Sequence, residues 1–218
     1  MFKYKKSIII GGSKGLGREI SKNLKKISKK IISCSRSDID TSDLKSVKNF
    51  LKKHKSVDIL VLNSGGPPPL KFNEISEKNW YKYFTQLFLG FCVILQNIKI
   101  RNGGYVFYIS SSIIKEPDAN LILSSSMRSG FSSVIKSLSS VYAQNNISLI
   151  NIAPGPFKTQ RVKELVKKNI SEYENKLPMK KLGDPSEIGK FVEFVVKNEI
   201  KYLAGSTIYF DGNTLKSL

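Results

Sequence analysis

The chain has few cysteines, few acidic residues and no long apolar run. Two cysteines, Cys34 and Cys92, are too few for a disulfide framework in 218 residues, so we expect a reducing, cytoplasmic environment. No apolar run approaches the roughly 18 residues that a membrane span requires, and we expect no contact with a membrane. The single histidine, His54, and the scattered acids and cysteines lack metal-ligand spacing, so no metal site is predicted.

The shortage of acidic residues leaves the chain strongly basic. It has 36 Lys and Arg residues against 17 Asp and Glu residues, a net charge of +19. Such a charge often accompanies nucleic-acid binding, but here the basic residues are spread over the chain instead of being clustered. Nearly all of them are lysine, whereas arginine is better suited to bidentate contacts with phosphates and bases. Nucleic-acid binding is therefore the third of the functions that we consider.

Strand and helix patterns alternate along the whole chain. The expected strands are residues 7–10, Lys30–Cys34, Val57–Leu62, Tyr105–Ile109, Ile147–Ile152 and Thr207–Phe210. The expected helices are Leu16–Ile27, a segment capped by Asp43, Trp80–Ile100, Leu123–Gln144, Val162–Glu174 and Pro185–Lys197. This alternation predicts an α/β fold of three layers, a doubly wound parallel sheet of the Rossmann type. No linker is evident, so we expect residues 1–218 to form one nucleotide-binding domain.

A glycine-rich segment lies between the first expected strand and the first expected helix. Its glycines allow a tight turn and a close approach of the backbone to a pyrophosphate, while the helix N-terminus offers N–H groups. The residues expected to contact such a ligand are Gly11, Ser13, Lys14, Gly15, Leu16 and Gly17. The alternative is a glycine turn without a ligand, which the complete strand–loop–helix context disfavours.

The spacing Gly11-xxx-Gly15-x-Gly17 resembles that of the short-chain dehydrogenase/reductase family, and the resemblance extends over nearly the whole chain. Further motifs follow in the family's order: Asp40, Asn63-Ser64-Gly65, Pro154-Gly155 with Thr159, and Asp211-Gly212. The resemblance implies that Asp40 contacts the adenine of a nicotinamide dinucleotide. It also implies that the Asn63 motif and the Pro154 turn bind this cofactor, with the turn at the nicotinamide end.

The end of the second expected strand bears on the choice between NADP and NAD. An acid there usually bonds the ribose 2′-hydroxyl of NAD, but this chain has Arg36. Arg36 and Lys14 are suited to the 2′-phosphate of NADP, so we predict NADP as the cofactor. Both cations also fit a solvated surface, and Asp38, two residues beyond Arg36, leaves NAD open.

The resemblance breaks down at the positions that carry the family's chemistry. There the family has Ser, Tyr and Lys, with Tyr as the proton donor, whereas this chain has Ser111, Ser124 and Arg128. Serine is a far weaker acid than tyrosine, and arginine stays protonated, so proton transfer must be altered. The Asn of the family's water relay corresponds to about Leu87, which carries no proton.

Other groups near these positions are alternatives for the missing acid. Glu116 is the foremost of them, and Lys115, Asp118 and Tyr108 also lie nearby in sequence. The segment Gly65–Pro69, Gly-Gly-Pro-Pro-Pro, is expected to form a stiff wall beside the cofactor. Together with Ser124 and Arg128 it resembles an atypical subgroup of the family that combines such a loop with Ser and Arg.

Three functions remain open from the sequence. The first is an NAD(P)-dependent oxidoreductase that acts on a small carbonyl or alcohol with an altered catalytic site. The second is a non-catalytic NADP-binding sensor or partner subunit, and the third is a basic nucleic-acid-associated protein. The family's packing of the long helices in pairs further implies a homodimer or homotetramer, because the expected helix Trp80–Ile100 is apolar nearly all round.

Overall fold

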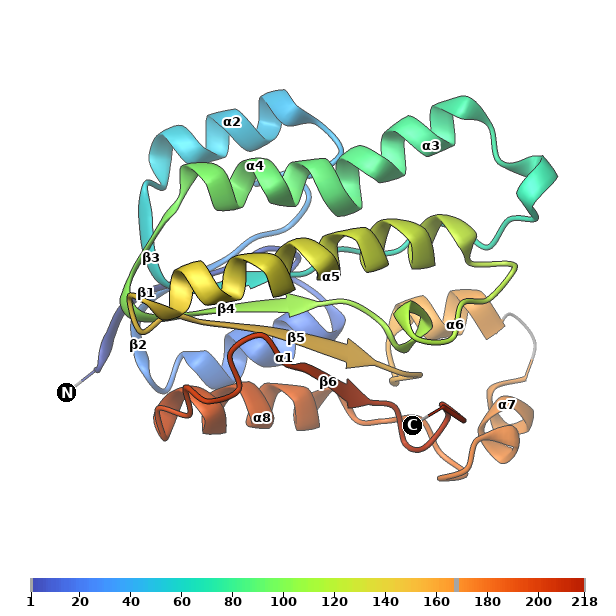
Figure 1. The fold of residues 1–218 in the computed structure, drawn as a ribbon. Coiled ribbons are helices and arrows are strands. Elements are labelled where there is room, and N and C mark those ends of the chain that lie inside the picture. The colour runs from blue at the N-terminus through green and yellow to red at the C-terminus, as the bar shows by residue number, and fades with distance from the viewer. Residues whose placement is uncertain (1, 167–168, 218) are drawn as a thin grey trace.

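The computed structural model describes residues 2–166 and 169–217, and these form one six-stranded sheet between two helical layers (Figure 1). The strands are β1 (Tyr4–Ile9), β2 (Ser28–Ser33), β3 (Ser56–Leu62), β4 (Lys99–Ile109), β5 (Ser148–Pro154) and β6 (Thr207–Phe210). Their order is β2-β1-β3-β4-β5-β6, and every neighbouring pair is parallel. The winding reverses between β1 and β3, which is where doubly wound sheets bind their ligands.

Helices cover both faces of the sheet (Figure 1). One face carries α1 (Gly15–Leu24) and α8 (Pro185–Lys197). The other carries α2 (Leu44–Lys53), α3 (Glu77–Phe84), α4 (Gly90–Asn97) and α5 (Ile122–Ala143). Two short helices, α6 (Gln160–Val166) and α7 (Ile170–Lys176), lie beyond the carboxyl ends of the strands (Figure 1). No helix in the described ranges is both long and apolar enough to cross a membrane.

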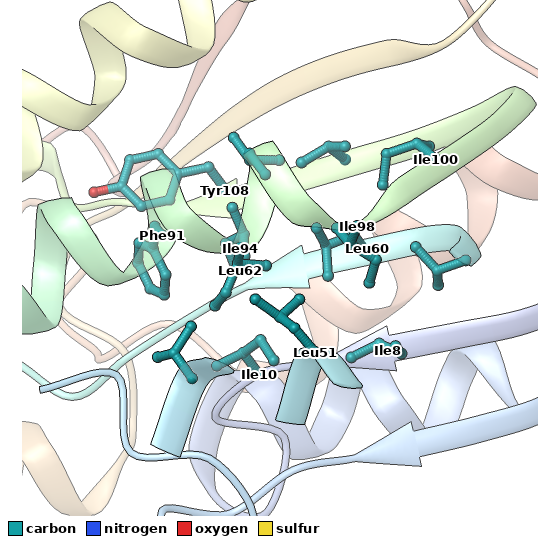
Figure 2. Packing of buried hydrophobic residues seen from close by; sticks show 14 of the residues in the cluster. Ile8, Ile10, Leu51, Leu60, Leu62, Phe91, Ile94, Ile98, Ile100 and Tyr108 are labelled. Carbon is teal, nitrogen blue, oxygen red and sulfur yellow. The ribbon is translucent and has the colours of Figure 1, made fainter. Parts of the chain in front are cut away.

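The strands bury apolar side chains on both faces because successive residues point in opposite directions. Ile8 and Leu60 pack into the cluster with Leu51 of α2 and Ile94 of α4 (Figure 2). Their neighbours Ile9, Ile59 and Val61 pack into the opposite cluster beneath α1 and α8. This two-sided burial explains the uninterrupted apolar runs in the sequence.

Capping residues set two helix starts where the sequence places them. The Asp43 carboxylate accepts a hydrogen bond of 2.8 Å from the backbone N–H of Lys45, as expected for the cap of α2. Asp184 caps α8 in the same way, and Pro185 occupies the first turn, where its missing N–H has no cost. The predicted bounds of α8 and β6 agree with the structure.

The structure corrects two expected helices. The helix predicted over Trp80–Ile100 begins at Glu77, passes through a wide π turn at Thr85–Leu89 and ends at Asn97, while Ile100 belongs to β4. The helix predicted over Val162–Glu174 is two helices, because Asn169 is extended and caps α7. β4 begins six residues before its predicted start at Tyr105, and the remaining strands and helices differ from the prediction by no more than three residues at their ends. The predicted fold class, a three-layer doubly wound parallel sheet, is confirmed.

Candidate cofactor and substrate cleft

A cleft of about 750 Å³ opens at the carboxyl ends of the strands, at the switch point between β1 and β3. The loops after β1, β2, β3, β4 and β5 line it, together with α6 and the start of α5. Its size is typical of a site for a cofactor and a small substrate. One continuous cleft therefore joins the glycine loop to the segment that holds the family's catalytic positions.

The glycine loop is shaped by close backbone packing. Gly11 has a φ of +63°, in the left-handed region that glycine adopts without strain. A Cβ atom on Gly17 would lie 2.2 Å from the carbonyl oxygen of Gly11, so only glycine fits there. Asn63, at the end of β3, donates a hydrogen bond of 3.0 Å from Nδ2 to the same carbonyl. These contacts hold the loop against the sheet and leave the first turn of α1 facing the cleft.

The ionisable side chains of the loop after β2, together with Lys14 of the glycine loop, separate into those that line the cleft and one that does not. Arg36 and Lys14 are exposed and line the cleft. Asp38 does not line it, because its carboxylate accepts hydrogen bonds from the N–H and hydroxyl of Ser35, which also lower its pKa. Asp40 lines the cleft, with its carboxylate bonded to the N–H and hydroxyl of Ser42. This end of the cleft therefore presents two cations and one acid, Asp40, while Asp38 is held in its own turn.

Arg128 is buried, with 5% of its surface exposed, and its guanidinium joins several backbone segments. Nη1 donates to the carbonyl oxygens of Ile109 at 2.9 Å and Ser110 at 3.2 Å, at the end of β4. Nη2 donates to the carbonyl of Ser64 at 2.9 Å, and Nε donates to Oγ of Ser124 at 3.2 Å. The buried charge is thus stabilised by neutral oxygens instead of a carboxylate. Arg128 connects α5 to the ends of β3 and β4.

The Gly-Gly-Pro-Pro-Pro loop, Gly65–Pro69, depends on side chains for its hydrogen bonds. Gln86 donates from Nε2 to the Gly65 carbonyl at 2.8 Å and to the Ser64 hydroxyl at 2.9 Å. Arg161 of α6 donates from Nη2 to the Pro67 carbonyl. Proline has no N–H to offer, so the loop cannot pair regularly with a neighbouring strand. Contacts from the π turn, α5 and α6 fix its position instead.

Gln86, not Leu87, is the residue of the long helix that faces the cleft. The family's relay position corresponds to about Leu87, but the wide turn at Thr85–Leu89 interrupts the regular helix at this point. Leu87 is fully buried. Oε1 of Gln86 is also buried and makes no hydrogen bond in the described residues, which leaves an acceptor at the wall of the cleft.

Ser111 and Ser124 both line the cleft, as their spacing predicts. Ser111 follows β4 directly and is partly buried, while Ser124 lies in the first turn of α5 with 6% of its surface exposed. Because Oγ of Ser124 accepts a hydrogen bond from Arg128, its own hydroxyl proton is available to another acceptor. The two hydroxyls stand where the family's serine and tyrosine are expected.

Glu116, the foremost alternative for the missing acid, forms its hydrogen bonds outside the cleft. The Glu116 carboxylate accepts hydrogen bonds of 2.8 and 2.7 Å from the N–H groups of Lys216 and Ser217, and these bonds lower its pKa. Tyr108 is fully buried in the core, and burial raises its pKa to about 12 against the opposing charge of Arg128. Neither residue lines the cleft, and neither do Lys115 and Asp118. The hypothesis of a relocated acid at these positions gains no support from the geometry.

The structure brings nearly all of the sequence-predicted site residues to this one cleft. Those that line it are Gly11, Ser13, Lys14, Gly15, Leu16, Arg36, Asp40, Asn63, Ser64, Gly65, Ser111, Ser124, Arg128, Pro154, Gly155 and Thr159. Gly17 lies beneath the loop instead, where it permits the close packing described above. Further residues line the cleft that the sequence does not single out, Gln86, Arg161 and Glu164 among them. No group of three His, Cys, Asp or Glu residues in the described ranges could hold a metal ion.

Comparison with known proteins gives matches along most of the chain. Residues 12–213 match the family described as enoyl-(acyl carrier protein) reductase. The 3-oxoacyl-[acyl-carrier-protein] reductase FabG of Buchnera aphidicola subsp. Schizaphis graminum is 26% identical over an alignment of 237 positions. This alignment spans 95% of this chain and 96% of the relative. The NADPH-dependent reductase BacG of Bacillus subtilis is 27% identical over 198 residues, covering 82% of this chain and 76% of the relative.

Solved structures agree on the fold. The angucycline C-6 ketoreductase LanV with bound NADP superimposes with a TM-score of 0.86 and 16% identity, over 98% of this chain and 96% of LanV. YwfH, an NADPH-dependent reductase involved in bacilysin biosynthesis, superimposes with a TM-score of 0.85 and 21% identity, over 98% and 99% of the two chains. At these identities the likeness establishes the fold alone. Together with the family match over residues 12–213, the topology and the glycine loop identify the chain as a member of the short-chain dehydrogenase/reductase family of oxidoreductases.

Proposed function

We propose that the protein is an NADP-dependent oxidoreductase that acts on a small carbonyl compound or alcohol through an altered catalytic site. The observation that carries this proposal is the single cleft, which connects Arg36 and the glycine loop to Ser111 and Ser124. The relatives named as NADPH-dependent reductases support the same cofactor. In this reaction the carbonyl carbon gains a hydride, its oxygen gains a proton, and the dinucleotide is oxidised.

The residues around the cleft fit a dinucleotide. The N–H groups at the start of α1 would hold the pyrophosphate, and Arg36 with Lys14 would hold the 2′-phosphate. Asp40 would lie at the adenine, and the remaining predicted residues would hold the nicotinamide end: Asn63, Ser64, Gly65, Pro154, Gly155 and Thr159. The bound nicotinamide supplies the hydride.

Two serines are left to contact the reacting oxygen. Ser124 donates its free hydroxyl proton in a hydrogen bond to the carbonyl oxygen, and Ser111 provides a second donor. Arg128 acts as a positioning residue, because its N–H groups hold Ser124 and the strand ends, and its charge favours a developing oxyanion. A serine is too weak an acid to complete the transfer alone, so the proton comes from water in the cleft. This arrangement predicts slow turnover of ordinary ketones.

An assay of NADPH oxidation against a panel of short aldehydes, ketones and oxo acids tests the function. We expect measurable turnover of some carbonyl compounds, with rates reduced relative to a tyrosine-dependent site by up to about 10²–10⁴-fold, the value of a positioned acid. If no carbonyl in the panel is reduced while NADPH binds tightly, the protein is the non-catalytic NADP-binding sensor or partner subunit. One observation favours this alternative: most of the N–H groups of Arg128 donate to backbone carbonyls and are therefore not free to bind a substrate.

We further propose that the Gly-Gly-Pro-Pro-Pro loop, together with Ser124 and Arg128, defines one subgroup of the family. They are in direct contact here: Arg128 bonds the residue before the Gly-Gly-Pro-Pro-Pro loop, and Arg161 bonds a carbonyl within it. A lysine at position 128 has a single ammonium group and could not bridge Ser64, Ile109 and Ser124 together. The arginine and the loop are therefore parts of one arrangement.

The exposed cations predict a preference for NADPH over NADH. We expect Arg36 and Lys14 to favour the phosphorylated cofactor by about 1.5–3 kcal/mol, the contribution of a charge-assisted hydrogen bond. Arg36→Asp should remove this preference, and titration calorimetry with both cofactors measures it. Arg18→Asp is the matched control, because Arg18 is exposed on α1 and does not line the cleft. Equal affinities of the unaltered protein for NADPH and NADH would refute the assignment.

We propose a homodimer or homotetramer assembled through α3, α4 and α5. Phe84 and Val141 are exposed on these helices, and Phe88, Val93 and Leu138 are only partly covered. An apolar helix face of this kind is stabilised by a second copy. Light scattering at micromolar concentration should report at least twice the monomer mass of 24.5 kDa. Val141→Lys should shift the protein toward the monomer, and a monomeric unaltered protein would contradict the proposal.

A further inference from the structure

Two arginines, Arg128 and Arg161, line the end of the cleft that contains Ser124. Neither forms an ion pair with a carboxylate in residues 2–166 and 169–217. Glu164, one turn along α6, also lines the cleft and lies close enough to favour the charge of Arg161, but it forms no ion pair with it. This end of the cleft thus presents two guanidinium groups and one carboxylate, and neither arginine is paired directly with a carboxylate in the described chain.

The two arginines differ in how fully their donors are used. The Arg128 guanidinium donates four hydrogen bonds inside the protein. Among the described residues Arg161 donates one, to the Pro67 carbonyl, and its side chain lines the cleft. Burial lowers the pKa of Arg161, the charge of Arg128 adds to this effect, and Glu164 opposes it. Arginine nevertheless stays protonated, so a partly desolvated cation with spare donors remains beside the cleft.

Gly66 locates this cation relative to the reacting group. A Cβ atom at Gly66 would lie 3.4 Å from Nη2 of Arg161 and 3.7 Å from Oγ of Ser124. The space left open by this glycine is therefore bounded by the guanidinium on one side and the serine hydroxyl on the other. A molecule that places its carbonyl oxygen at Ser124 has its neighbouring group within reach of Arg161.

From this arrangement we infer that the substrate is a small oxo acid whose carboxylate is bound by Arg161 while its carbonyl oxygen lies at Ser124. The planar fork of a guanidinium matches a carboxylate, and a bound anion would supply the direct ion pair that Glu164 does not form with Arg161. This inference rests on the proposed function, since it names the substrate class of the same site. Arg161 is then the residue that determines specificity, and Arg128 positions Ser124.

Binding to the complex with NADP⁺ tests the inference without turnover, because the oxidised cofactor has no hydride to give to a carbonyl. The probes are pyruvate, 3-oxobutyrate and 4-oxopentanoate, each paired with its neutral methyl ester, and calorimetry gives the affinities. We expect at least one acid to bind about 10-fold or more tightly than its ester, as a charge-assisted hydrogen bond provides. Arg161→Gln should abolish this difference, and Arg161→Lys should retain part of it.

Lys163→Gln is the matched control, because it removes one positive charge from the same helix at an exposed position outside the cleft. It should keep the preference for the acid. Equal binding of every acid and its ester, or a preference that survives Arg161→Gln, would overturn the inference. The inference would also be overturned if Arg161→Gln bound NADPH more weakly and still bound each acid more tightly than its ester, since Arg161 would then contact the cofactor. Acid binding that requires Arg161 but leads to no turnover with NADPH would support the carboxylate site at Arg161 and refute the reductase, since the acid would then be a ligand and not a substrate.

Discussion

Replacing Arg128 with methionine is expected to lower the free energy of unfolding by about 3 kcal/mol and turnover by on the order of 100-fold. Methionine is similarly long and leaves the carbonyls of Ser64, Ile109 and Ser110 without a donor. Each unpaired buried acceptor costs about 1–3 kcal/mol, and water entering from the cleft offsets part of the loss. Urea unfolding without cofactor and initial rates with NADPH measure the two effects.

Two further variants separate structure from chemistry. Ser124→Ala removes only the Nε partner of Arg128, so we expect a stability change below about 1 kcal/mol. Its turnover should fall less than that of Arg128→Met, because water can replace the lost hydroxyl. Arg128→Lys keeps the positive charge, so we expect its turnover to lie between that of Ser124→Ala and that of Arg128→Met. If Arg128→Met and the unaltered protein unfold at the same urea concentration, the proposed bridging role of Arg128 is refuted. Complete loss of turnover in Ser124→Ala, with NADPH binding intact, would make Ser124 the principal catalytic group.

The sequence predicts most of this fold because its signals are local. The segment Val57–Leu62, apolar except for Asp58, requires a strand buried on both faces, and Asp43 forms the cap that the pattern predicts. The glycine loop could be placed because strand, loop and helix follow one another directly in the chain. The Asn63 and Pro154 motifs could be placed because parallel strands bring their carboxyl ends to one edge.

The sequence could not predict what depends on distant contacts. The π turn at Thr85–Leu89 has no distinct sequence signal, and it turns Gln86 instead of Leu87 toward the cleft. Arg161 lies in a short helix whose position is set by tertiary packing, so its link to Pro67 was not foreseen. Glu116 was a plausible acid by its place in the chain, but it bonds Lys216 and Ser217, about 100 residues away.

The second large effect is expected for Gly17→Ala in the glycine loop. The added methyl carbon would lie 2.2 Å from the Gly11 carbonyl oxygen, so the loop must move away from the start of α1. Overpacking of this kind costs about 1–3 kcal/mol in stability. Because the displaced N–H groups are those proposed to bind the pyrophosphate, NADPH affinity should fall by on the order of 100-fold. Thermal unfolding and fluorescence titration with NADPH measure the two losses.

Gly65→Ala is the variant with which Gly17→Ala should be compared, because it adds the same methyl group at a position without close packing. Apart from its two chain neighbours, no atom of the described residues lies within 4 Å of a Cβ built on Gly65, so the protein without cofactor should unfold at an unchanged temperature. If the nicotinamide end of the cofactor passes over Gly65, as the motif Asn63–Gly65 implies, the same methyl group should weaken NADPH binding by about 10-fold through steric overlap. Unchanged binding by Gly65→Ala would place the cofactor away from this loop, whereas unchanged binding by Gly17→Ala would refute the pyrophosphate site. Loss of affinity in both variants, with loss of stability only in Gly17→Ala, is the pattern that separates a contact with the ligand from packing within the protein.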